Sequence, residues 1–191
     1  MKNIAILASG SGSNAENIAG YFADSERARV RLIVSDRENA GVLKRAKCLN
    51  IEGHHVSRKS MRESNQLMIL LHDAKIDLIV LAGFLALIPS DLIQAFDKRI
   101  INIHPALLPA YGGKGMYGDK VHQAVIENNE TESGISIHYV NEKYDEGRLI
   151  LQARCPVLPG DDVSSLANRI HKLEYRYYPQ VIDQLIEMDL V

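Results

Sequence analysis

The sequence predicts a single α/β domain with a Rossmann-like, mostly parallel sheet flanked by helices and an antiparallel strand pair near its C-terminal end. Apolar runs alternate with helical segments through the first hundred residues, which is typical of βαβ units with right-handed crossovers. A glycine-rich loop directly follows the first apolar run. Two β-rich runs, 134–140 and 149–157, then follow one another with only a polar turn between them, which is typical of a hairpin.

The strands are expected where short apolar runs are bounded by turn residues. A continuous apolar run such as Ile4–Ala8 is typical of a central strand that is covered on both faces. The expected strands are Ile4–Ala8, Arg29–Ser35, Ile51–Val56, Asp77–Ala82, Ile100–His104, Gly134–Val140 and Leu149–Val157.

The helices are expected in the segments between these runs. Leu67, Leu70 and Leu71 share one apolar face, and Ser90 after Pro89 is a suitable helix cap. We expect the last helix to be interrupted or kinked near Pro179, because proline lacks the N–H that an interior helical position needs. The expected helices are Ala15–Ala23, Ala40–Leu49, Met61–Ala74, Ser90–Phe96, Asp119–Asn128 and Val163–Met188.

Length and composition favour an ordinary soluble globular protein. A chain of 191 residues suits one domain over residues 1–191, and it has no repeat, linker or low-complexity segment. A net charge of −2 offers no basic field for nucleic acid or for a membrane surface, so we expect neither as a partner. Cys48 and Cys155 form no C-x-x-C motif and are expected to be reduced thiols in a cytoplasmic protein.

The loop Gly10–Asn14 is a candidate phosphate site. It joins the first strand to the first helix, where glycines allow a close approach and helical N–H groups bind anions. The pattern G-x-G-x-x-A from Gly10 to Ala15, with Asp36 about 20 residues further on, also fits a dinucleotide fingerprint. A nicotinamide-dependent oxidoreductase is therefore an open alternative, as is a turn that binds nothing. A Walker A loop is excluded because no Gly-Lys-Ser/Thr follows.

Asn102 and His104 form the first candidate catalytic pair. Residues two apart on a strand point to the same side, so both side chains project together where Pro105 ends the strand. An amide donor that steadies an oxyanion beside an imidazole that handles protons suits acyl transfer. The alternative is a buried structural histidine beside a turn-capping asparagine.

The acidic turn Asn141–Gly147 supplies the second candidate. If the hairpin returns to the same edge of the sheet, Asp145 would face His104, raise its pKa and anchor a proton-relay water. The alternative is a solvated hairpin tip. No two histidines combine with a carboxylate at metal-ligand spacing, so no metal is expected.

These motifs together resemble a known family. The sequences AGF at Ala82–Phe84, NIHPALLP at Asn102–Pro109 and Asp145-x-Gly147 are similar to those of folate-dependent formyltransferases, and the loop Gly10–Asn14 resembles that of the phosphoribosylglycinamide formyltransferase (GAR transformylase) family. The resemblance covers nearly the whole chain. It implies an enzyme of purine biosynthesis that moves a formyl group from the cosubstrate 10-formyltetrahydrofolate to the amine of glycinamide ribonucleotide.

The resemblance also implies roles for individual residues. Asn102, His104 and Asp145 would be catalytic, with His104 as general acid. The ribonucleotide would be bound by Gly12, Ser13, Asn14, His171, Lys172, Leu173 and Glu174. The folate would be bound by Leu85, Ala86, Leu87, Ile88, Asn102, Asn141, Glu142, Lys143, Tyr144 and Asp145. Residues 1–100 would then form a phosphate-binding half, and residues 101–191 a catalytic and folate-binding half.

Some positions depart from the family pattern. Ser60 stands where a folate-contacting arginine is expected, which leaves Arg58 or Arg62 for the folate tail, and Ala86 stands where other members often carry arginine. The glycine-rich loop Tyr111–Gly118 would be a mobile lid. His122 is a candidate contact for the phosphate, and His138 is expected to be a packed residue. A monomer or weak homodimer is expected, and a formyltetrahydrofolate hydrolase that uses the same three catalytic residues stays an alternative.

Overall fold

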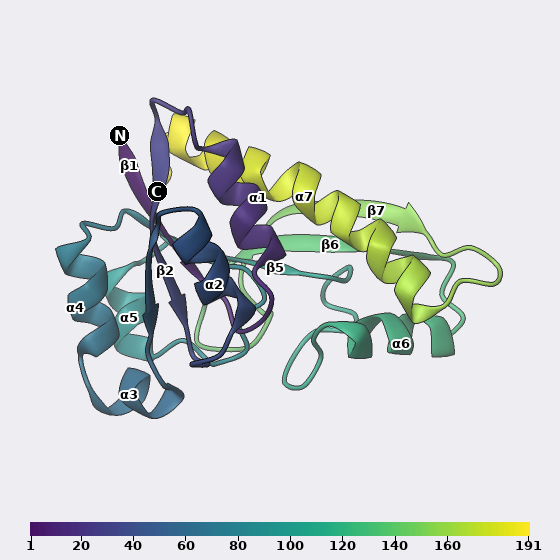
Figure 1. The fold of residues 1–191 in the computed structure, drawn as a ribbon. Helices are drawn as coiled ribbons and strands as arrows, with labels where there is room; N and C mark the ends of the chain where they lie inside the picture. Colours follow the sequence, from purple (N-terminus) through teal and green to yellow (C-terminus); the bar gives the residue numbers. More distant parts are fainter.

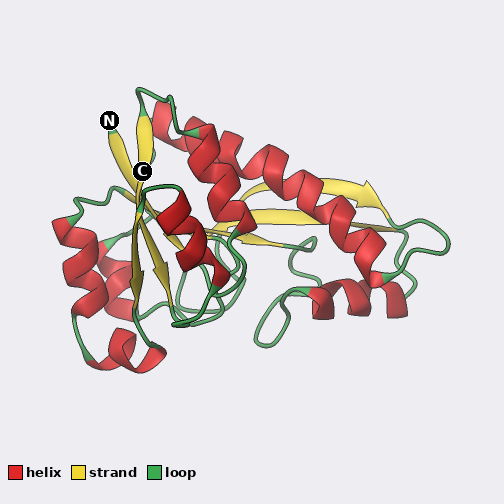
Figure 2. Ribbon diagram, in the orientation of Figure 1, coloured by secondary structure: helices red, strands yellow, loops and turns green.

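The computed structural model describes all 191 residues as one α/β domain around a seven-stranded sheet (Figures 1 and 2). The strand order is β3-β2-β1-β4-β5-β6-β7. The first five strands are parallel, and β6 is antiparallel to both β5 and β7, which confirms the predicted fold class. The strands are β1 (Lys2–Leu7), β2 (Ala28–Ser35), β3 (Glu52–His55), β4 (Leu78–Leu81), β5 (Ile100–His104), β6 (Glu132–Tyr139) and β7 (Leu149–Pro156).

Helices cover both faces of the sheet (Figure 1). The helices are α1 (Ser13–Tyr21), α2 (Gly41–Cys48), α3 (Arg58–Glu63), α4 (Gln66–Asp73), α5 (Ser90–Ala95), α6 (Asp119–Glu127) and α7 (Val163–Glu187). The core is divided by the sheet into two apolar clusters. Ile4 and Ile6 of β1 pack in one cluster with α1, α2 and α7, while Ala5 and Leu7 pack in the other with α3, α4 and α5. This division follows from the period of two along a strand.

The prediction of one helix over Met61–Ala74 is wrong. The segment forms two helices, α3 and α4, because Ser64 adopts an extended conformation (φ −139°, ψ 157°). The Ser64 hydroxyl donates to the carbonyl of Ser60, and Ser57 caps the start of α3. Serine and asparagine compete with helical hydrogen bonds in this way, so Ser64 and Asn65 separate the two helices.

Proline 179 does not interrupt α7, contrary to one of the two expected outcomes. The helix runs without a break from Val163 to Glu187. Because Pro179 has no N–H, the carbonyl of Tyr175 lacks its helical donor. Asn17 of α1 supplies one instead, its Nδ2 lying 2.9 Å from that carbonyl oxygen. The missing hydrogen bond is therefore replaced by a contact that ties α1 to α7.

The strand order determines where a ligand can bind. The connections after β1 and β4 leave neighbouring strands toward opposite faces of the sheet, and ligands of such sheets bind in the crevice outside the carboxyl ends of those strands. The glycine loop follows β1, Ala82–Leu85 follows β4, and the Asn102–His104 pair lies in the adjacent β5. No helix combines the length and apolarity needed to cross a membrane.

Candidate active site

A cavity of about 480 Å³ lies in the predicted crevice. Its volume is within the range of about 300–1,000 Å³ that is usual for small-molecule sites. The loops after β1 and β4 are tied together at its floor. The N–H of Ser9 donates to the carbonyl of Gly83 (3.0 Å), and the N–H of Leu85 donates to the Ser9 hydroxyl (2.9 Å). These two hydrogen bonds therefore hold the loops that border the crevice in place.

The glycine loop forms one end of the cavity. Gly12 directly precedes α1 and has φ +81°, which places it in the left-handed region. A Cβ at Gly12 would also overlap the side chain of Val42, so a larger residue fits neither the conformation nor the space. Gly12, Ser13 and Asn14 all line the cavity at the start of α1, where backbone N–H groups and the helix dipole favour an anion.

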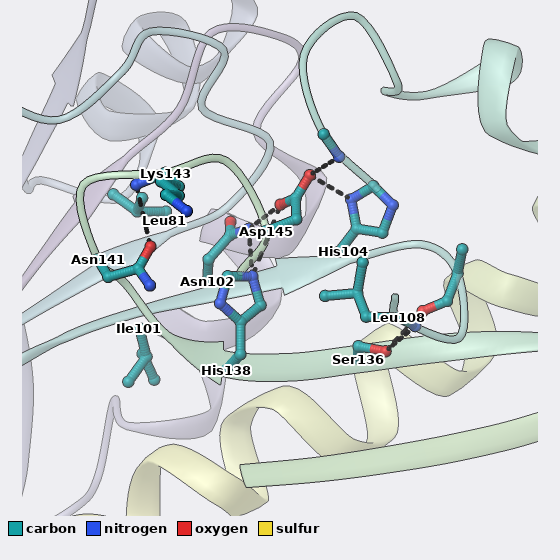
Figure 3. Close-up of polar contacts among 12 residues, drawn as sticks. Leu81, Ile101, Asn102, His104, Leu108, Ser136, His138, Asn141, Lys143 and Asp145 are labelled. Atoms are coloured by element: carbon teal, nitrogen blue, oxygen red, sulfur yellow. Dashed lines mark hydrogen bonds and ion pairs between the residues drawn. The ribbon is translucent and has the colours of Figure 1, made fainter. Parts of the chain in front are cut away.

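Asn102, His104 and Asp145 meet at the same cavity (Figure 3). Nδ2 of Asn102 donates to Oδ1 of Asp145 (3.3 Å), and Nδ1 of His104 lies 3.5 Å from Oδ2 of Asp145. The His104 side chain is 4% exposed and that of Asp145 is 11% exposed. The carboxylate also accepts a hydrogen bond from the N–H of Gly113 (2.9 Å). Asp145 is thus held inside the site, whereas Glu142, Lys143 and Glu146 of the same turn are exposed.

The hydrogen-bond partners assign the protons of both histidines. Nε2 of His104 lies 2.7 Å from the carbonyl oxygen of Tyr111, which can only accept, so Nε2 carries a hydrogen. Nδ1 of His138 lies 2.8 Å from the carbonyl oxygen of Tyr139 and carries a hydrogen for the same reason. Nε2 of His138 is then free to accept from Nδ2 of Asn102 (3.1 Å). Both N–H groups of Asn102 are therefore engaged, one by His138 and one by Asp145.

The turn that carries Asp145 depends on two local features. Asp145 has φ +57°, a left-handed conformation that aspartate tolerates better than most residues. A Cβ at Gly147 would overlap the carbonyl oxygen of Tyr139, so only glycine lets the chain pass back against β6. The Asp145-x-Gly147 motif is explained by this geometry.

Burial decides the direction of the pKa shift at His104 but not at Asp145. It lowers the pKa of His104 below its ordinary value, and the nearby Asp145 charge opposes this only in part. Asp145 therefore acts on the pKa of His104 in the expected upward direction, but burial outweighs its effect. Burial would raise the pKa of Asp145, but its contacts with His138, His104 and the Gly113 N–H outweigh burial and hold that pKa below its usual range. At neutral pH the structure holds a neutral imidazole beside a carboxylate.

Glu174 connects the glycine loop to the opposite wall of the cavity. Its Oε2 accepts from Nδ2 of Asn14 (3.0 Å) and lies 2.9 Å from Nδ1 of His171. The Glu174 side chain is 7% exposed, and its hydrogen bond raises the pKa of His171. His171 and Glu174 are three residues apart on α7 and so share one helix face.

Asp36 is not placed as a dinucleotide site requires. Its side chain is completely buried, and its Oδ2 lies 2.6 Å from Nε of Arg58. Asp36 does not line the larger cavity, whereas the acidic residue of a dinucleotide fingerprint faces the ribose hydroxyls. The structure also contains no group of three or more histidine, cysteine, aspartate or glutamate side chains that could hold a metal ion.

A second cavity of about 420 Å³ continues from the first, and Arg58 and Tyr144 line both. Its walls include Ala86, Leu87, Ile88, Glu142 and Arg62.

Most residues with a predicted binding role lie at these cavities. Those at the larger cavity are Gly12, Ser13, Asn14, Leu85, Asn102, His104, Tyr144, Asp145, His171 and Glu174. Four predicted contacts, Lys172, Leu173, Asn141 and Lys143, line neither cavity. Lys172 and Leu173 lie on other faces of α7, Leu173 packing on the core, and Lys143 pairs with Glu146 in solvent.

Three contacts of the site were not predicted. The carbonyl of Tyr111 and the N–H of Gly113 belong to the backbone, so no side-chain pattern indicates them. His138 was expected only to pack, and it is 2% exposed. It also bonds Asn102, because the antiparallel register places the two residues opposite each other. A strand register of this kind has no signal in a single sequence.

Replacing Asp145 by asparagine is expected to lower the pKa of His104 further. The Asp145 charge favours the imidazolium, so its removal leaves burial unopposed. The shift can be measured by titrating the imidazole resonances by NMR, with His72 as internal control because its side chain is 88% exposed on α4. An unchanged or raised His104 pKa in the variant would contradict the assigned interaction.

Comparisons with known proteins agree with the fold and the site. A sequence model of the formyl transferase family matches residues 2–182. The chloroplastic phosphoribosylglycinamide formyltransferase of Arabidopsis thaliana is 41% identical over 97% of this chain, which spans 66% of that protein's length. The phosphoribosylglycinamide formyltransferase of Haemophilus influenzae is 36% identical over 98% of this chain and 88% of its own length.

Solved structures show the same likeness. Glycinamide ribonucleotide transformylase 1 from Geobacillus kaustophilus superposes with a TM-score of 0.88 at 36% identity, over 97% of this chain and 99% of that one. The phosphoribosylglycinamide formyltransferase from Streptococcus pneumoniae superposes with a TM-score of 0.84 at 37% identity, over the same shares of the two chains. The chain therefore belongs to the formyl transferase family.

Proposed function

We propose that this protein is a phosphoribosylglycinamide formyltransferase, which moves the formyl group of 10-formyltetrahydrofolate to the amine of glycinamide ribonucleotide in purine biosynthesis. One observation carries the proposal: a single cavity has a helix start suited to an anion at one end, and a buried imidazole beside a partly buried amide and carboxylate at the other. The names of the bacterial and plant relatives support the same reaction. The protein acts as a monomer or weak homodimer in the cytoplasm, where its two free thiols stay reduced.

The ribonucleotide would lie along the cavity with its phosphate at Gly12, Ser13 and Asn14. Backbone N–H groups at the start of α1 supply the hydrogen bonds, and the imidazolium that Glu174 favours at His171 adds positive charge. The ribose would lie near Glu174, and the amine would reach the catalytic residues. Residues 1–100 would provide the phosphate loop, and residues 101–191 would provide the catalytic groups together with His171 and Glu174.

The folate would occupy the part of the cavity that continues into the second cavity, away from the glycine loop. Its pterin would lie against the backbone of Leu85–Ile88 and of the turn at Tyr144–Asp145, and its anionic tail would extend into the second cavity toward Arg62. Arg58 lines the same cavity, but its Nε is held by Asp36. Arg62 has its guanidinium free of ion pairs, so it is the better partner for a mobile carboxylate.

The reaction begins with attack of the amine on the formyl carbon. This step forms a C–N bond and a tetrahedral intermediate with a negative oxygen and a positively charged nitrogen. An N–H of Asn102 would turn from His138 or Asp145 to that oxygen. Collapse of the intermediate breaks the bond to N10 of the folate, which takes up the proton that the attacking nitrogen loses.

Proton movement is the proposed role of His104 and Asp145. His104 begins neutral, and the developing negative charge on the substrate then favours its protonation. A water on Asp145 would carry the proton from the attacking nitrogen to His104, which as general acid would deliver it to N10. The 3.5 Å between Nδ1 and Oδ2 is long for a direct hydrogen bond, which suits a pair that shares a water.

Formyl transfer with and without the amine tests the proposal. The purified protein is expected to form formylated ribonucleotide from both substrates and to release little formate when the ribonucleotide is left out. His104→Ala should lower turnover by about a hundred- to a thousandfold, the usual loss on removing one such group. Formate release independent of the amine would instead indicate a hydrolase. The matched control is His72→Ala, at an exposed position on α4 far from the cavity lining.

Arg62→Ala is expected to raise the KM for 10-formyltetrahydrofolate about three- to tenfold, because an exposed charge-assisted contact contributes about 1 kcal/mol. The KM for the ribonucleotide should not change. Lys59→Ala, which removes another exposed cation of α3, is the control. Equal effects of the two substitutions would contradict a specific contact at Arg62.

A further inference from the structure

His122 of α6 is a buried residue that the catalytic scheme leaves without a role. It is 2% exposed and lines the larger cavity, yet its Nδ1 has no hydrogen-bond partner. Asn14 lines the same cavity, and its Oδ1 is likewise buried and unpaired. Only two other buried side-chain polar atoms in the chain lack a partner. Because such atoms are rare in folded proteins, two at one cavity indicate a ligand that supplies their partners.

The place of His122 identifies the part of the ligand that it faces. Glu174 binds Asn14 of the phosphate loop, and its charge acts on both His122 and the catalytic His104. The cavity lined by His122 and Glu174 is also lined by the start of α1 at Ser13 and Asn14 and by Asn102 and His104. In a ribonucleotide, the group between the phosphate and the reactive amine is the ribose.

The chemistry of the ring fits a neutral partner. Burial lowers the pKa of His122, and the neighbouring His171 lowers it further, while Glu174 and Asp119 act in the opposite sense. A neutral imidazole offers one donor and one acceptor, which suits a hydroxyl group better than a phosphate dianion. The free Oδ1 of Asn14 accepts a hydrogen bond, so the two residues together match a pair of hydroxyl groups.

We propose that His122 recognises the ribose of the ribonucleotide substrate, its unpaired nitrogen forming a hydrogen bond with a ribose hydroxyl while Oδ1 of Asn14 accepts from a second. This assignment rests on the proposed function and adds a specificity-determining residue to it. It replaces the expectation that His122 contacts the phosphate.

Two substitutions at one position separate recognition from packing. His122→Leu introduces an apolar side chain of similar size and removes both nitrogens. His122→Asn keeps a polar atom close to the position of Nδ1. The leucine variant is expected to raise the KM for glycinamide ribonucleotide about three- to tenfold, the usual effect of one lost hydrogen bond. Its kcat and its KM for 10-formyltetrahydrofolate should stay within twofold, and the asparagine variant should recover most of the affinity.

Substrate analogues test the same contact without relying on the variant's fold. The 2′-deoxy or the 3′-deoxy ribonucleotide is expected to bind the wild-type protein about three- to tenfold more weakly by calorimetry, and to show no such loss with His122→Leu. Equal affinities of the wild type for all three ribonucleotides, or a leucine variant whose two KM values rise together, would overturn the inference. If the wild type binds no ribonucleotide at all, the proposed function itself fails.

Discussion

The structure depends on one buried carboxylate. Asp145 lies at 11% exposure among His104, His138, Asn102 and the N–H of Gly113, and these contacts keep it ionised despite burial. Burial of a charge is costly unless partners surround it. The fold provides those partners from three separate segments, namely β5, β6 and the loop before α6 (Figure 3). β6 runs antiparallel from beside His104 to beside Ile101, and the turn after it folds back so that Asp145 reaches Asn102 and His104 at the carboxyl end of β5.

The carboxyl edge of the parallel strands also explains why the cavity has the glycine loop at one end and Asn102, His104 and Asp145 at the other. The chain leaves β1 through the glycine loop into α1, and leaves β4 through the loop that begins at Ala82. The helix start at the crevice favours an anion, and β5 presents Asn102 and His104 to the same cavity. Glu174 of α7 accepts a hydrogen bond from Asn14 and so ties the last helix to the glycine loop at one end of the cavity.

Much of this arrangement could be predicted from the sequence. Each predicted strand overlaps an observed one, and the glycine loop, the Asn102–His104 pair and the Asp145-x-Gly147 turn were identified from their residue types, their spacing and the resemblance to a known family. The helix break at Ser64 depends on a side-chain hydrogen bond that competes with the helix. The unbroken helix at Pro179 depends on the tertiary hydrogen bond from Asn17 to the Tyr175 carbonyl. The periodicity of the sequence reveals neither. The place of His138 needed a strand register, and the direction of the His104 pKa needed its burial. Neither quantity is encoded in local sequence.

The central claim is that His104 and Asp145 act as one unit in formyl transfer. A double-mutant cycle tests it most directly, with turnover measured for His104→Ala, Asp145→Ala and the combined variant. If the two groups share one proton path, the double variant should be about as slow as the slower single variant, because the second loss removes nothing further. Two losses that multiply in the double variant would show independent roles and would contradict the account.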